Sequence, residues 1–150
     1  MDKVVQQKLD ALKNVVGNTP LAKINLKYKG KETCVYAKLE YFNFSGSIKD
    51  RMAYCILKDA YEKGAIKPGD EIVEATSGNT GIGLAAVAAA RGYRIILTMP
   101  ETMSVERRNM LKAYGAELVL TDGTKGMSGA IAKADELAKE IENSFIPGQF

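Results

Sequence analysis

A chain of 150 residues, 46% of them hydrophobic, can bury one ordinary core, so a single domain is the default expectation. The formal net charge is only +3, and Lys and Arg are spread along the chain without a dense block, which argues against a nucleic-acid partner. The sequence contains no histidine, which excludes Ser-His-Asp triads, histidine general bases and most zinc sites, so we expect no metal site.

The N-terminal region carries a helical pattern followed by a hairpin pattern. Apolar residues at helical spacing predict a helix over residues 3–16, and the glycine and proline that follow end it. Alternating apolar and polar residues over 21–26 and 33–39, on either side of Lys29-Gly30, predict a β-hairpin. We treat residues 1–40 as a separate unit because the rest of the chain follows a different pattern.

The chain shows no signal for membrane targeting. Its first 16 residues mix charges throughout and lack the apolar core of a signal peptide, and the longest apolar stretch, residues 82–90, is too short to span a bilayer. Cys34 and Cys55 are too far apart for a CxxC motif and are interpreted as buried small apolar residues in a reducing compartment. We therefore expect a soluble, cytoplasmic protein with no membrane partner.

A lysine stands at the start of the next predicted helix, over residues 48–63. Ser47 and Asp50 have the spacing of a capping box, which places Lys49 in the first turn. The helix dipole disfavours a cation there, and partial burial would also favour the neutral amine that Schiff-base chemistry needs. The alternative is a solvated lysine at a helix start, and Asp50 and Arg51 are interpreted as helix-face residues.

The second part of the chain, within a unit spanning residues 41–150, alternates strands and helices. The predicted strands cover residues 71–75, 93–99 and 117–121, and the predicted helices cover residues 80–91, 104–114 and 127–143. Such alternation with short links predicts an α/β fold, with an open parallel sheet covered by helices on both faces. Ligands bind such sheets at the carboxyl ends of the strands, where residues 76–81 would lie.

The turn between the first of these strands and its helix, residues 75–83, reads Ala-Thr-Ser-Gly-Asn-Thr-Gly-Ile-Gly. Helix N-termini leave backbone N–H groups unpaired, and the helix dipole adds partial positive charge. Thr76, Ser77 and Thr80 add hydroxyl groups, and the three glycines allow a ligand to approach the backbone. This turn predicts a site for a small anion.

The residues alone leave the kind of anion open. A P-loop requires Lys followed by Ser or Thr after its last glycine, but Gly83 is followed by Leu84. The glycine spacing is the reverse of a dinucleotide-binding fingerprint, although Glu101 stands about 20 residues on, where a ribose-binding acid would be. A plain tight turn is the remaining alternative.

Four segments resemble a known family. They are Asn-Thr-Pro-Leu at 18–21, the motif from Ala-Lys-Leu-Glu to Gly-Ser-Ile-Lys-Asp-Arg at 37–51, Thr-Ser-Gly-Asn-Thr-Gly at 76–81, and Met-Pro-Glu-Thr-Met-Ser at 99–104. In this order the chain resembles the N-terminal half of the cysteine synthase (O-acetylserine sulfhydrylase) and cystathionine β-synthase group. The resemblance implies the three-layer fold of fold-type II enzymes, pyridoxal 5′-phosphate as cofactor, and a homodimer.

The resemblance also assigns site residues. It implies that Lys49 is the catalytic lysine to which the cofactor is covalently attached, and that Asn79 hydrogen-bonds the 3′-oxygen of the cofactor. It also implies that the anion bound by the turn at 76–81 is a substrate carboxylate rather than a phosphate. The residues implied to bind it are Thr76, Ser77, Gly78, Asn79, Thr80 and Gln149.

Part of the family pattern is missing from the sequence. In the family, a separate loop holds the cofactor phosphate and a hydroxyl residue contacts the pyridine nitrogen, both in a second half. Residues 1–40 would pack with that half. The apolar, turn-rich end at residues 146–150 is interpreted as a truncation, so the chain alone is expected to bind cofactor poorly and to be inactive.

The expected reaction is β-replacement on a serine-type amino acid, first of all O-acetylserine plus sulfide to give cysteine. Cystathionine formation and a sulfide-releasing cysteine lyase that forms serine remain alternatives, and a non-catalytic half-domain or dinucleotide-binding module is an alternative of another class. Three residues depart from the family pattern, namely Phe44, Ser45 and Ala75. We expect Phe44 to exclude large thiols and the Ser45 hydroxyl to orient water or sulfide.

Overall fold

The computed structural model describes residues 3–76 and 78–149. Its helices are α1 (Lys3–Lys13), α2 (Lys49–Glu62), α3 (Asn79–Arg91), α4 (Val105–Ala113) and α5 (Gly126–Glu140), with short 3-10 helices η1 (Glu40–Phe42) and η2 (Gly123–Lys125). Its strands are β1 (Leu21–Tyr28), β2 (Lys31–Lys38), β3 (Glu71–Ala75), β4 (Arg94–Pro100), β5 (Glu117–Thr121) and β6 (Ser144–Phe145). The helices and strands expected from the sequence are all present: β3 and β5 have the predicted bounds and the other elements have shifted ends, whereas η1, η2 and β6 were not expected.

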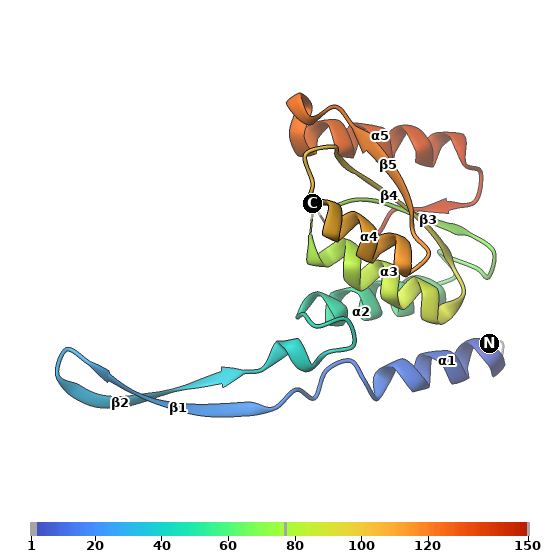
Figure 1. Cartoon of the computed structure of the whole chain (residues 1–150). Coiled ribbons are helices and arrows are strands. Elements are labelled where there is room, and N and C mark those ends of the chain that lie inside the picture. Colours follow the sequence, from blue (N-terminus) through green and yellow to red (C-terminus); the bar gives the residue numbers. More distant parts are fainter. Residues whose placement is uncertain (1–2, 77, 150) are drawn as a thin grey trace.

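The four strands of the second part form one parallel sheet in the order β5-β4-β3-β6. Helix α5 covers one face of this sheet, and α2, α3 and α4 lie on the other side, with α1 packed against α3 (Figure 1). This arrangement confirms the predicted three-layer α/β fold with helices on both faces.

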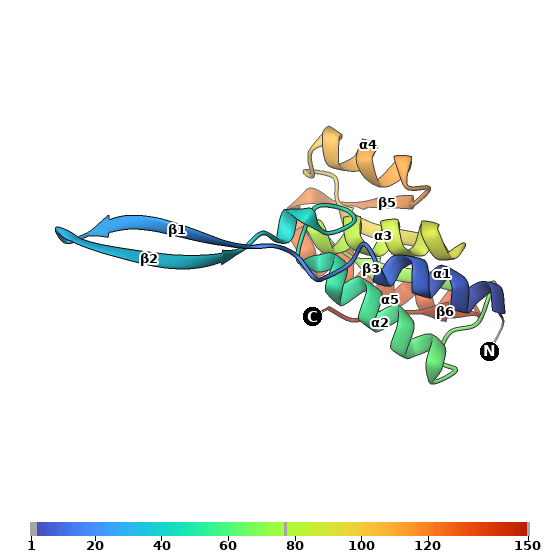
Figure 2. The same ribbon diagram turned by 90° about the horizontal axis from the view of Figure 1, so that it is seen from below.

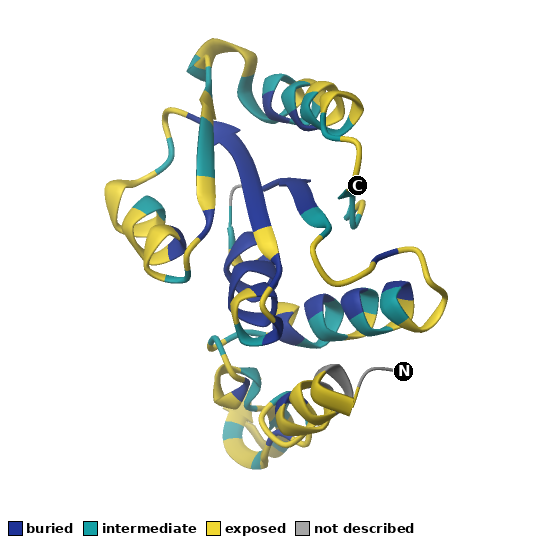
Figure 3. Ribbon diagram, turned by 90° about the vertical axis from the view of Figure 1, so that its right-hand side faces the viewer, coloured by how far each residue is buried: buried dark blue, intermediate teal, exposed yellow. Residues whose placement is uncertain are grey.

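The core lies on both faces of β3 and β4. On one face Ile72 and Leu97 pack against α2 and α3, and on the other Val73 and Ile96 pack against α5. Because both faces are covered, these strands read as nearly continuous apolar runs. Figure 3 shows the result, with the central strands and α3 buried and the outer surfaces of the other helices exposed.

The hairpin projects away from these layers in two perpendicular views (Figures 1 and 2). Strands β1 and β2 pair antiparallel, and both turn residues, Lys29 and Gly30, have positive φ angles of 49° and 80°, as a two-residue type I′ turn requires. Large apolar side chains remain exposed on it, including Leu21 at 58%, Tyr28 at 61% and Tyr36 at 65%. The predicted hairpin is confirmed, but no described residue covers either face.

Two details differ from the expectations. Cys55 is exposed and Cys34 is half-buried, because one lies on the outer side of α2 and the other on the uncovered hairpin. Helix α1 ends at Lys13, short of residue 16, and its Leu12 is buried in the core against the α/β layers. In the described ranges, the longest and most apolar helices still fall short of what a bilayer crossing needs.

Candidate functional site

One buried threonine organises the turn that joins β3 to α3. Thr76 Oγ1 accepts hydrogen bonds from the backbone N–H of Gly81, at 2.9 Å, and of Gly78, at 3.4 Å. A Cβ at Gly81 would lie 2.4 Å from Thr76 Cγ2, so a glycine is needed for the helix to close over this side chain. Thr76 therefore satisfies two backbone N–H groups at the start of α3 with its side-chain oxygen.

The first turn of α3 presents donors at the carboxyl end of the sheet. Among the described residues, the backbone N–H groups of Asn79 and Thr80 have no acceptor. Such unpaired N–H groups and the helix dipole favour an anion at this end. The structure thus brings Thr76, Gly78, Asn79 and Thr80 together in one turn, which we call the anion-binding turn, while the predicted Ser77 lies outside the described residues.

Gln149 lies beside this turn, although it is distant in sequence. Its Nε2 donates a hydrogen bond of 2.9 Å to the carbonyl oxygen of Ala75, the residue before Thr76. The structure therefore joins Gln149 to the other residues that the sequence predicted for the substrate carboxylate.

A buried carboxylate that the sequence analysis missed holds the Gln149 segment in place. Glu74, in β3, accepts hydrogen bonds from the backbone N–H of Gly148 at 2.8 Å and of Gln149 at 3.4 Å, and from Ala75 at 3.0 Å. Burial raises the pKa of the Glu74 carboxyl, and these N–H donors oppose that rise. A charged residue between Val73 and Ala75, in the buried part of the strand, was the signal that could have identified it.

Lys49 is the first residue of α2, which lies against α3 at a glycine. A Cβ at Gly83 would lie 3.0 Å from Asp50 Oδ1 and 3.3 Å from the carbonyl carbon of Lys49, so glycine allows the two helices to approach closely. Gly83 follows Thr80 by less than one helical turn, so the start of α2 lies next to the anion-binding turn. The Lys49 side chain is exposed rather than partly buried as expected, because Asp50 occupies the contact with α3.

The start of α2 also differs from the predicted capping box. Ser47 Oγ accepts the backbone N–H of Lys49, at 3.1 Å, and not that of Asp50. The Asp50 side chain is fully buried and accepts hydrogen bonds from the backbone N–H and the hydroxyl of Ser45. Asp50 is therefore a buried residue that holds the segment before α2, not a helix-face residue. The Ser45 hydroxyl donates to Asp50 and is not available to orient water.

A network of hydrogen bonds anchors the segment before α2. Arg51 Nε and Nη2 donate to the two carboxylate oxygens of Glu40, at 2.7 and 2.9 Å, and Nη2 also donates to Thr19 Oγ1 at 3.1 Å. Thr19 Oγ1 and Asn43 Nδ2 donate to the same carboxylate, at 2.7 and 2.8 Å. These donors, Arg51 foremost, lower the pKa of Glu40 from 4.5 to about 2. Arg51, predicted as a helix-face residue, thus connects the family motif at 37–51 with the one at 18–21.

A second cation near the anion-binding turn was also missed. Arg107, on α4, has its Nη1 3.4 Å from the position that a Cβ on Gly78 would take. No sequence pattern indicates this proximity, because it depends on how α4 packs beside α3.

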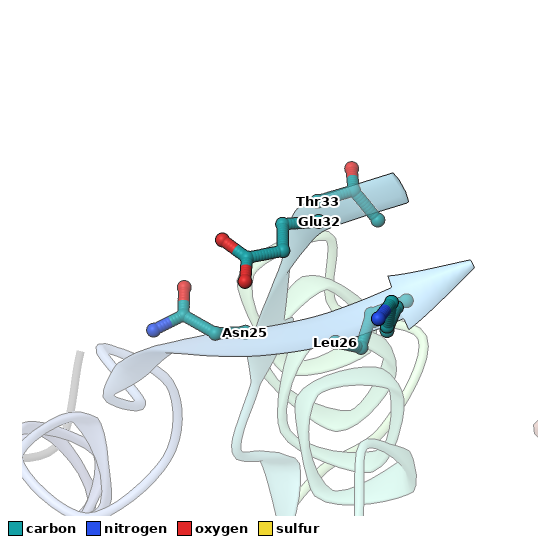
Figure 4. Close-up of a pocket in the computed structure, with 5 residues that line it drawn as sticks. Asn25, Leu26, Glu32 and Thr33 are labelled. Carbon is teal, nitrogen blue, oxygen red and sulfur yellow. The ribbon is translucent and has the colours of Figure 1, made fainter. Parts of the chain in front are cut away.

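A hollow of about 500 Å³ lies far from these residues, between the two hairpin strands. Figure 4 shows Asn25 and Glu32 extending from the two strands toward the same side of it. Its walls come from the hairpin alone and include none of the predicted site residues. In the part of the chain that the structure describes, no three His, Cys, Asp or Glu side chains come together as a metal site would require.

Comparison with known proteins identifies the family of the chain. The model of the family described as "Pyridoxal-phosphate dependent enzyme" matches residues 12–150. A cysteine synthase of Staphylococcus aureus is 55% identical over 147 residues, which are 98% of this chain and 47% of that protein. A Bacillus subtilis protein named "Probable cysteine synthase" is 57% identical over 137 residues, 91% of this chain and 44% of that protein.

A solved structure gives the same result for the fold. The crystal structure of a hydrogen sulfide-producing enzyme from Fusobacterium nucleatum matches with a TM-score of 0.92 and 45% identity, covering 97% of this chain and 44% of that one. The chain spans about half the length of the curated relatives it matches. It belongs to the family of pyridoxal-phosphate dependent enzymes and, as its motifs predicted, to the cysteine synthase and cystathionine β-synthase group of fold type II.

Proposed function

We propose that this chain carries the catalytic lysine and the substrate-carboxylate site of an enzyme that performs β-replacement on a serine-type amino acid, with O-acetylserine and sulfide giving cysteine. The observation that carries this proposal is the contact of α2 with α3 at Gly83, which places the amine-bearing residue Lys49 beside the anion-binding turn. The carboxylate site and the amine must lie close enough together for one amino-acid substrate molecule to reach both.

The residues present fit one end of pyridoxal phosphate. The exposed primary amine of Lys49 suits an aldehyde, and the exposed amide of Asn79 suits the neighbouring ring oxygen. When bound, the cofactor supplies an electron-withdrawing ring that stabilises negative charge at the substrate α-carbon. We propose that the groups for its phosphate and pyridine nitrogen lie in the part of the relatives that this chain does not cover.

The chain's own residues would bind the substrate and move one proton. The N–H groups of Asn79 and Thr80, the hydroxyls of Thr76 and Thr80, and the Gln149 side chain would hold the α-carboxylate. Lys49 Nζ, in its neutral form, would accept the proton from the α-carbon. We assign no direct role to the Ser45 hydroxyl, because it donates to Asp50.

The test replaces Lys49 in the full-length enzyme. Lys49→Ala is expected to abolish turnover and to remove the visible absorption band of covalently attached cofactor. Lys63→Ala, at the exposed C-terminal end of the same helix, is the matched control and should keep both. Normal steady-state activity in Lys49→Ala would refute the assignment.

A second reaction is favoured by the similarity to a hydrogen sulfide-producing enzyme, namely release of sulfide from cysteine with water added to give serine. The same residues serve both reactions, so the substrates decide between them. The full-length enzyme would be given O-acetylserine plus sulfide, cysteine alone, or serine plus homocysteine, with sulfide and amino-acid products followed. Cystathionine as the dominant product would overturn both assignments while leaving the role of Lys49 intact.

We also propose how the chain is organised beyond its own core. Residues 1–40 would pack with the part that the relatives have in addition, and the exposed apolar side chains of the hairpin support this. Free thiols at Cys34 and Cys55 fit a cytoplasmic location. A homodimer rests on family membership alone, and light scattering of the full-length protein would test it.

A further inference from the structure

Glu74 is a carboxylate whose partners are all backbone N–H groups. The residue is 3% exposed, and among the described residues no Lys or Arg forms an ion pair with it. A buried ionised group of this kind is costly unless donors satisfy its oxygens. Here Oε2 accepts from Gly148 and Gln149, and Oε1 accepts from Ala75. The C-terminal segment therefore supplies two of the three donors that satisfy the buried carboxylate, and the carboxylate in turn holds that segment in place.

Packing around this segment is incomplete. A pocket of about 110 Å³ lies between β3, α5 and the segment, and its lining includes Glu74, Ile131, Ile146 and Gly148. A gap of this size forfeits part of the dispersion contacts that would otherwise fix the backbone. The hydrogen bonds to Glu74 therefore restrain the backbone of Gly148 and Gln149 where packing does not.

This restraint acts on a residue of the carboxylate site. The backbone of Gln149 is held by Glu74, and its side chain is held by the carbonyl oxygen of Ala75, one residue before Thr76. Two adjacent residues of β3 thus fix both ends of Gln149. The N–H dipoles around Glu74 also offset its negative charge, which limits repulsion of a bound substrate carboxylate.

We propose that Glu74 is a positioning residue for substrate binding: it holds the Gly148-Gln149 backbone at the end of β3 and so places the Gln149 side chain beside the anion-binding turn. The inference rests on the proposed function, because it assigns Gln149 to the substrate carboxylate. The hydrogen bonds from the Gly148 and Gln149 backbone to Glu74, which we call the clamp, can however be measured without any reaction.

The experiment compares Glu74→Gln with Glu71→Gln in the full-length enzyme. Glu71 is the matched control because it lies on the same strand at the opposite end and pairs with Arg94. In Glu74→Gln one acceptor oxygen becomes an NH2 group that faces a backbone donor whichever way the amide turns, and the remaining oxygen loses its charge. Hydrogen exchange of the Gly148 and Gln149 amides should therefore accelerate about tenfold or more, as expected for weakened charge-assisted hydrogen bonds. The KM for the amino-acid substrate should rise by a similar factor, with kcat changed less than about twofold.

The outcomes separate the clamp from the function. Unchanged exchange in Glu74→Gln would overturn the clamp, whatever the enzyme catalyses. Faster exchange with an unchanged KM would overturn the positioning role. A wild-type enzyme that turns over no serine-type amino acid would refute the proposed function, while exchange would still decide the clamp. If Glu74→Gln does not fold, Glu74→Asp, which keeps the charge but shortens its reach, gives the same readouts.

Discussion

The hairpin and the α/β layers are both built on strands, but only one of them has a core of its own. In β3, Ile72 and Val73 are fully buried, because helices cover both faces. In β1 and β2, apolar side chains such as Tyr36 stand in solvent, and a two-stranded hairpin is at best marginally stable alone. The contrast teaches that an apolar pattern predicts a strand reliably, yet does not say whether the partner that covers it lies within the same stretch of chain.

The largest expected effect separates the two regions by stability. Leu84, on α3, is fully buried in the core, and Leu84→Ala should lower the free energy of unfolding of the chain by about 2–5 kcal/mol. Ile24→Ala, on the hairpin, should change it by less than about 0.5 kcal/mol, because the side chain is exposed. Urea denaturation of both variants would test this, and equal losses would mean that the hairpin is buried in solution.

Ligand binding should depend on the anion-binding turn and not on the hairpin. Thr80→Val, in the anion-binding turn, should weaken binding of the amino-acid substrate by the full-length enzyme about tenfold or more, since one charge-assisted hydrogen bond is worth about 1.5–3 kcal/mol. Thr33→Val, the same exchange on the hairpin, serves as the control and should leave binding unchanged. Loss of cofactor with intact substrate affinity would instead indicate that the turn holds phosphate.

The contact between α2 and α3 gives a smaller effect with a defined sign. Alanine is a better helix former than glycine by about 1 kcal/mol, but a Cβ at Gly83 would press on Asp50 and the Lys49 backbone, and overpacking costs about 1–3 kcal/mol. Gly83→Ala should therefore destabilise the chain. Ala89→Gly, on an exposed position of α3, measures the helix propensity alone. A stabilised Gly83→Ala variant, in thermal unfolding, would mean that the helices are not in close contact.

The weakest effect concerns the junction between hairpin and layers, and it depends on pH. The pKa of Glu40 is about 2 in the folded chain against 4.5 as its ordinary value, so its ionised form stabilises the fold above pH 4.5. That contribution is lost as pH falls from about 4.5 toward about 2. Glu40→Gln should flatten the plot of the free energy of unfolding against pH in this range, whereas Glu32→Gln on the hairpin should not. Parallel curves for wild type and Glu40→Gln would disprove the network.

The sequence predicted local structure and motif chemistry better than it predicted partners. The turn between β3 and α3 follows from short-range rules and lies where the sequence predicted it, whereas α2 begins one residue later than predicted and leaves the Lys49 side chain exposed. The partners of Glu74 and Arg51 could not be predicted, because they lie 74 residues and 11 or 32 residues away in sequence. The predicted capping box is absent for a similar reason, since the Asp50 carboxylate accepts its hydrogen bonds from Ser45.

The bond between Glu74 and Gly148 also has a kinetic consequence. It closes a loop of 74 residues that contains α3, β4, α4, β5 and α5, so it belongs to the most non-local contacts of the chain. Non-local contacts form late in folding, because the entropy cost of closing a long loop is offset only after the intervening elements have ordered. Gln149 is therefore expected to reach its place only once the sheet and α5 are assembled, which makes completion of the carboxylate site one of the last events in folding.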